Sequence, residues 1–266
     1  MRVARVLDAH VFLGDSIQGF GQQPDGVLAE LDRLGIEAAV LVPVRPRGYA
    51  YGPENERVAD ARRRHPDRFL GLGRVDPRQP DAATEAERCL AELGLRGVFV
   101  HPWEDAIAIS DARLDPILEV CAARSAPLMV AAGYPWVSEA TQVAELARRH
   151  PSVPIVMTNG GQINISGLGQ RNAWLAMEGH PNVHITTSGV YREDFIEEVA
   201  AGLGAGRVMF GSQSPLFDMD MELHRLLWAH VDDGPRATML WDTAARVFGT
   251  PGDSARWPRT EGVERR

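Results

Sequence analysis

The feature that most constrains the fold is an alternation of short apolar runs with longer amphipathic stretches, repeated eight times along the chain. Such alternation is typical of βα units, in which buried parallel strands are separated by helices. Eight units in 266 residues, 44% of them hydrophobic, predict a single closed α/β barrel of the (β/α)8 (TIM) type. The expected strands are Val3–His10, Ala38–Pro43, Phe69–Asp76, Leu95–His101, Pro127–Gly133, Pro154–Asn159, Val183–Ser188 and Arg207–Ser212.

The barrel is expected to occupy residues 1–249 as one domain. Residues 250–266 contain two prolines and several charges without a helical period. We expect this tail to be disordered, or to dock through Trp257 on the barrel or on a second subunit.

The charge and cysteine content exclude several kinds of partner and cofactor. The formal net charge is −8, and the arginine runs 62–64 and 148–149 are short, which argues against nucleic-acid binding. Cys89 and Cys121 do not form a ligand-spaced pair, so neither a disulfide framework nor a zinc cage is expected. Without a signal-like or membrane-length apolar segment, the expectation is a soluble cytoplasmic protein with a small-molecule substrate and no membrane partner. A homodimer remains an open alternative.

Three His-Pro pairs, beginning at His65, His150 and His180, each follow a helix-like stretch and precede a strand. Proline stops a helix, and a histidine in the last turn meets the negative end of the helix dipole. These histidines are therefore expected at the bottom of the barrel, away from any site.

Barrel sites are built where the strands end, and four such segments here carry recognisable residues. They are Asp8-Ala9-His10-Val11-Phe12, Gly97 to Pro102, Asn159-Gly160-Gly161 and Phe210 to Pro215. Together with Thr243 to Gly249, these segments resemble motifs of the amidohydrolase-related family that includes aminocarboxymuconate decarboxylase-like and dicarboxylate lactonase-like enzymes. The resemblance covers nearly the whole chain and implies a TIM barrel with hydrolase or lyase chemistry.

The departures from the family pattern concern the metal site that the resemblance implies. Phe12, Ala131, Asn159 and Gln213 stand at four positions where the family has metal ligands, and only His10 of the usual set remains. Phe99 replaces a lysine that some relatives carbamylate. Because a tight site needs roughly three protein ligands, no metal and no other cofactor is expected. A new site, with His10 and His101 joined by Asp15 or Glu104, is the alternative.

The expected catalytic residues are His10, His101, Asn159 and Gln213. The histidines are acid–base candidates at physiological pH, and the two amides offer donors to a developing oxyanion. The competing interpretation of each histidine is a side chain fixed by hydrogen bonds in the barrel wall.

The remaining polar and aromatic side chains near the strand ends are candidates for substrate binding. Arg74 is placed to hold a carboxylate, or else to pair with Asp8 or Asp76, whereas Arg45 and Arg47 are interpreted as solvated loop charges. Rings at the rim predict a partly aromatic ligand held by stacking, or else ordinary loop packing. The rings expected to bind substrate are Phe12, Trp103, Tyr134, Trp136 and Tyr191.

Two classes of function remain open on this sequence. The first is a metal-independent hydrolase or lyase acting on a small carbonyl- or carboxylate-bearing molecule, by lactone hydrolysis, decarboxylation, dehydration or cyclisation. The second is a pseudoenzyme that serves as a ligand-binding or partner subunit. A conventional metal-dependent hydrolase with a rearranged site is a further alternative.

Overall fold

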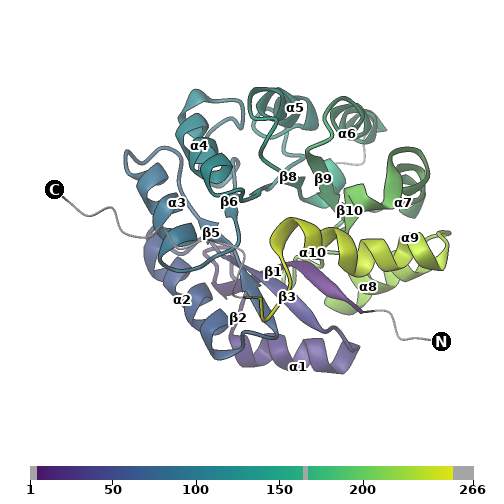
Figure 1. Cartoon of the computed structure of the whole chain (residues 1–266), viewed down its shortest axis with the longest axis horizontal. Coiled ribbons are helices and arrows are strands. Elements are labelled where there is room, and N and C mark those ends of the chain that lie inside the picture. Colours follow the sequence, from purple (N-terminus) through teal and green to yellow (C-terminus); the bar gives the residue numbers. More distant parts are fainter. Residues whose placement is uncertain (1–4, 164–166, 254–266) are drawn as a thin grey trace.

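The computed structural model describes residues 5–163 and 167–253, in which a ring of helices surrounds a ring of strands (Figure 1). One parallel run of strands goes through β1, β3 and β4, and a second goes from β5 to β10. The short strand β2 pairs antiparallel with the end of β1. The strands are β1 Leu7–Asp15, β2 Gly21–Gln22, β3 Ala38–Pro43, β4 Phe69–Gly71, β5 Gly73–Arg74, β6 Val98–Val100, β7 Leu128–Val130, β8 Ile155–Met157, β9 Val183–Thr186 and β10 Val208–Met209.

Two sets of backbone hydrogen bonds close these strands into the predicted barrel. Leu72, between β4 and β5, donates to Leu41 at 2.9 Å, so the expected third strand is one pathway with a break at this residue. At the other junction, Ala9 donates to Phe210 at 2.9 Å and Phe12 donates to Ser214 at 2.8 Å. The (β/α)8 architecture is therefore confirmed.

The first strand was predicted as Val3–His10, because Val3, Ala4 and Val6 precede it with little interruption, and the observed strand begins at Leu7. The observed β1 runs on to Asp15, and Val3 and Ala4 lie outside the described residues. This extension carries the chain past His10 and Phe12 while both are still in extended backbone, so their side chains share one face of the strand.

The helices lie on the outer surface, and two of them end on the predicted histidines. His65 follows α2 and His150 follows α5 as the capping residue, which confirms their place at the starts of the next strands. The helices are α1 Pro24–Leu34, α2 Tyr51–Arg64, α3 Ala82–Ala91, α4 Asp115–Ala123, α5 Ala140–Arg149, α6 Gly167–Gly179, α7 Glu193–Val199, α8 Met219–Trp228, α9 Asp233–Ala237 and α10 Thr243–Phe248.

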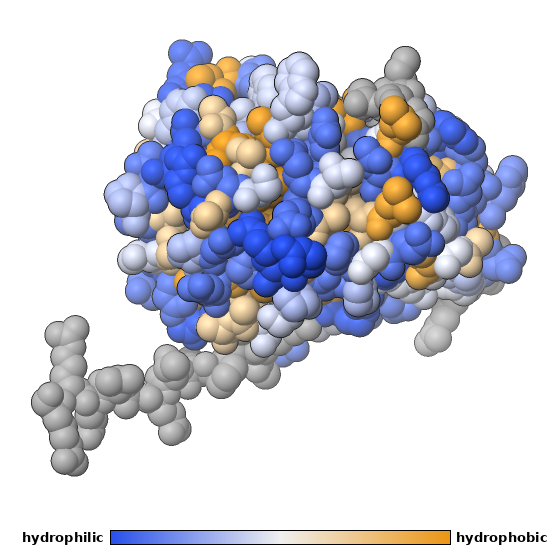
Figure 2. Space-filling view, turned by 90° about the horizontal axis from the view of Figure 1, so that it is seen from above, coloured by the Kyte–Doolittle hydropathy of each residue, from blue (hydrophilic) through white to orange (hydrophobic). Residues whose placement is uncertain are grey.

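The core has two layers. One lies between the strands and the helices, and the other fills the barrel interior with side chains such as Leu7, Phe99 and Met129. On the outer face drawn in Figure 2, apolar residues occur in scattered groups between charged ones. Cys89 in α3 and Cys121 in α4 are buried free thiols.

The end of the chain is described as far as Asp253, so Trp257 and the rest of the expected tail lie outside the described residues. No helix in the described part of the chain is long and apolar enough to cross a membrane.

Candidate functional site

His10 lies within β1 and is fully buried. Neither of its ring nitrogens has a hydrogen-bond partner among the described residues. The ring is flanked by Phe12 at 4.7 Å and Phe99 at 5.8 Å between centroids. Burial, followed by the charge of His101, lowers the pKa of His10 to about 3, so the imidazole is neutral at physiological pH.

Asp8, two residues earlier on the same strand, fixes the backbone around His10. Its Oδ1 accepts from the backbone N–H of His10 at 3.0 Å and from that of Ser212 at 2.9 Å. Its Oδ2 has no partner among the described residues, and burial raises the pKa of this carboxyl to about 7. Asp8 thus joins β1 to the segment after β10.

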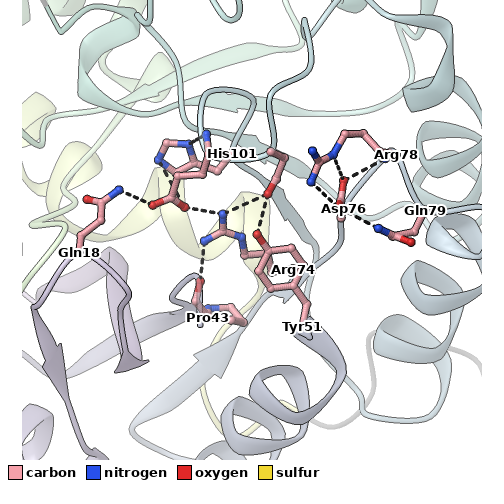
Figure 3. Close-up of polar contacts among 10 residues, drawn as sticks. Gln18, Pro43, Tyr51, Arg74, Asp76, Arg78, Gln79 and His101 are labelled. Atoms are coloured by element: carbon pink, nitrogen blue, oxygen red, sulfur yellow. Dashed lines mark hydrogen bonds and ion pairs between the residues drawn. The ribbon is translucent and has the colours of Figure 1, made fainter. Parts of the chain in front are cut away.

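His101 lies beyond β6 and contacts a buried ion pair (Figure 3). Its Nδ1 accepts from the backbone N–H of Glu104 at 3.3 Å, so the neutral ring carries its hydrogen on Nε2. The Glu104 carboxylate lies 3.9 Å from that Nε2. Burial, then the charges of Arg74 and Arg45, lower the pKa of His101 well below its usual value.

Arg74, in β5, is fully buried and is held by the loop after β6. Its guanidinium donates to Glu104 at 2.5 Å and lies 3.7 Å from Asp105 and 4.5 Å from the ring centre of Tyr51. The expected pairing with Asp8 or Asp76 is wrong. Figure 3 shows the carboxylate of Asp76 taken by Arg78 instead, because the turn after β5 brings those two residues together.

Asn159, after β8, and Gln213, after β10, are in contact at the ends of their strands. The Nδ2 of Asn159 donates to the Oε1 of Gln213 at 3.0 Å, and Gln213 donates its backbone N–H to the carbonyl of His10 at 2.7 Å. No hydrogen bond from the Nε2 of Gln213 is found among the described residues. Both residues have positive φ, near 57° and 58°, a strained backbone of the kind that clusters at functional sites.

The aromatic rim divides into rings that join this cluster and rings that do not. Tyr134 and Trp103 stack at 5.7 Å, and both lie beside His101, at 5.2 Å and 6.4 Å. Trp136 is 86% exposed and Tyr191 is 38% exposed. For these last two, no ring contact with the cluster is found within residues 5–163 and 167–253.

Arg45 differs from the solvated loop charge expected for it. It follows β3, is half-buried, and its guanidinium lies 3.9 Å from the ring centre of Tyr49. The Nε is buried without a hydrogen-bond partner, and the charge is close enough to lower the pKa of His101. Arg47, two residues on, is exposed as expected.

Sequence reasoning gave Glu104 only a role in an alternative metal site, and it did not single out Gln18 at all. Glu104 accepts from Gln18 at 2.7 Å as well as from Arg74, which fixes the loop after β1 to the loop after β6. The signal for Glu104 was its position three residues after His101, whereas contact with Gln18 depends on loop conformation.

A closed parallel barrel with its polar side chains gathered at the strand ends is the architecture of barrel enzymes. Residues 15–250 match the family described as Amidohydrolase. The chain therefore belongs to the amidohydrolase family, as its motifs predict.

Several of the relatives and solved structures that this chain resembles are named as decarboxylases. Gamma-resorcylate decarboxylase from Rhodococcus jostii is 24% identical over an alignment 283 positions long. The alignment covers 82% of this chain and 85% of the relative. The solved 2,6-dihydroxybenzoate decarboxylase from Rhizobium has a TM-score of 0.73 at 20% identity, covering 92% of this chain and 99% of its own. A dihydroxybenzoic acid decarboxylase from Polaromonas, solved with manganese and 2-nitroresorcinol, has a TM-score of 0.74 at 18% identity, covering 92% and 97%.

The residues of this chain do not fit a manganese ion like the one in the Polaromonas structure. Manganese needs several carboxylate, imidazole or water ligands around one point. Around His10 the nearest rings are Phe12 and Phe99, and residues 5–163 and 167–253 contain no group of three His, Cys, Asp or Glu that could hold a metal. Of the two carboxylates considered for an alternative metal site, Asp15 is exposed and pairs with Arg57, and Glu104 is paired with Arg74.

Proposed function

We propose that this chain is a lyase that removes carbon dioxide from a small aromatic acid without a protein-held metal. The observation that carries the proposal is the setting of His101. Its Nε2 is paired with a carboxylate, and its ring borders the stacked Trp103 and Tyr134. Trp103 is 55% exposed, so this stack is open to a flat ligand.

In this reaction His101 supplies a proton to the ring carbon that bears the carboxylate. The bond from that carbon to the carboxylate then breaks, its electron pair returns to the ring, and carbon dioxide leaves. Glu104 stabilises the imidazolium form, which His101 reaches by taking a proton from water. A bound substrate carboxylate offsets the positive charges of Arg74 and Arg45, which otherwise oppose protonation.

His10, Asn159 and Gln213 are proposed to hold the substrate oxygen deeper in the barrel. The Nε2 of Gln213 is available as a donor. The two unpartnered ring nitrogens of neutral His10 can donate one hydrogen bond and accept one. Because His10 is covered by Phe12, entry of the substrate requires aromatic side chains at the mouth to move. Lactone hydrolysis, dehydration and cyclisation would use the same groups.

The proposal is tested with 2,6-dihydroxybenzoate in deuterated water. We expect resorcinol carrying deuterium at the carbon that lost carbon dioxide. Replacing the acid, in His101→Gln, should lower kcat by about 100-fold or more. His180→Gln, at the other end of the barrel, is the matched control and should match the wild type. Undiminished turnover by His101→Gln would contradict the proposal.

A second candidate function is ligand binding without turnover. It is favoured by one observation, the hydrogen bond from the Nδ2 of Asn159 to the Oε1 of Gln213, which already engages part of this amide pair without a substrate. Binding of hydroxybenzoates that are recovered unchanged, with equal affinity in the wild type and in His101→Gln, would support this candidate.

A further inference from the structure

Arg45 is a cation near the end of β3, and its side chain lacks hydrogen-bond partners among the described residues. Its Nε is buried and has no hydrogen bond, and no carboxylate within ion-pair distance of it is found among the described residues. A buried donor left unpaired costs about 1–3 kcal/mol. The side chain as a whole is half-buried, so an anion at the mouth can reach the guanidinium from its exposed side.

Three other arginines near this rim already have carboxylate partners. Arg74 is paired with Glu104, Arg78 holds Asp76 through two nitrogens, and Arg57 pairs with the carboxylate of Glu54. Their charges are neutralised within the protein, so they attract a further anion less than Arg45 does.

Arg45 is also held in a fixed position. Its guanidinium carbon lies over the ring of Tyr49, 3.9 Å from the ring centre, and its carbonyl accepts from the backbone N–H of Ile17 at 2.9 Å. The cation–π contact and the backbone bond reduce the freedom that a long side chain would lose on binding. A guanidinium fixed in this way is suited to bind a carboxylate through two parallel hydrogen bonds.

We propose that Arg45 binds the carboxylate of the substrate, so that the site selects monoanionic aromatic acids over neutral aromatic molecules. The inference rests on the proposed function and adds the substrate's charge and the residue that recognises it. The backbone of Arg45 is bonded to Ile17, whose neighbour Gln18 donates to Glu104 near His101, and the Trp103–Tyr134 stack lies beside the same histidine. An acid held by Arg45 therefore lies next to the proton donor and the aromatic stack.

The test is calorimetric binding of benzoate and benzamide, two rings that differ in charge. Benzoate lacks the electron-donating hydroxyls that let a ring accept a proton, so binding is measured without turnover. The wild type should prefer benzoate, and Arg45→Gln should weaken benzoate binding by about 10-fold or more while leaving benzamide unchanged. Arg45→Lys keeps the charge and should retain part of the preference.

Arg47→Gln, two residues away on the exposed loop, is the matched control and should bind like the wild type. The inference is overturned if Arg45→Gln binds benzoate as tightly as the wild type, or if the wild type shows no preference for benzoate. Turnover of 2,6-dihydroxybenzoate is measured separately. A charge preference that depends on Arg45, in a protein that releases no carbon dioxide, would reject the lyase assignment and leave this binding role standing.

Discussion

Burial keeps the interior histidines of this barrel in their neutral form. His184, on β9, is almost fully buried, and its Nδ1 donates a hydrogen bond to the carbonyl of Asn182 at 3.2 Å. Desolvation first, then the charges of Arg207 and Arg246, lower its pKa to about 4 from an ordinary value of 6.5. His10 is shifted in the same direction, whereas the raised pKa of Asp8 acts in the opposite direction.

We therefore predict that acid destabilises the fold in part through His184. The unfolded histidine takes up its proton near pH 6.5 and the folded one only near 4, so the contribution is complete above 6.5 and is lost as the pH falls below it. Between about pH 7.5 and about pH 5 this loss amounts to about 2 kcal/mol.

Urea unfolding at the two pH values checks this prediction. His184→Gln should reduce the difference in unfolding free energy between them, whereas His230→Gln, which replaces a highly exposed histidine, should leave it unchanged. An identical pH dependence in the wild type and His184→Gln would contradict the shifted pKa.

At the scale of elements, the strands were predictable because each is an apolar run between helix-like stretches. Their short observed lengths were not, since hydrogen bonding in a tilted barrel ends before the apolar run does. The placement of Asn159 and Gln213 at strand ends followed from the sequence. The pairing of Arg74 with Glu104 did not, because it depends on the path of the loop after β6.

Close approach of two strand-end loops leads to a prediction at Gly133. Its φ is 91°, and a Cβ added there would lie 2.4 Å from the backbone of Gln162. Gly133→Ala must therefore move the loop after β7 or the one after β8, and we expect a loss of about 3 kcal/mol or more.

Gly26→Ala in α1 is the matched control, because an added Cβ meets nothing within 4 Å there. It should leave stability unchanged or raise it by up to about 1 kcal/mol. Thermal and urea unfolding measure the stability of both variants. Equal stability of the two would contradict the prediction, because it would show that the loops move at little cost.

At the scale of the whole molecule, the barrel has the architecture of its family and an apolar cluster in its interior. Phe12 and Phe99 pack on His10 from two strands and join the interior core. The family was predictable from motifs spread along the chain, whereas the closure of the mouth by these rings required the structure. We propose that the side chains of this barrel carry out the chemistry without a metal.

The most direct test of that account is the rate of 2,6-dihydroxybenzoate decarboxylation before and after exhaustive treatment with a chelator, with the metal content measured in the same samples. We predict that the rate does not change when bound metal is removed and that added manganese does not raise it. Loss of activity with the metal, and its recovery on addition of manganese, would contradict the account.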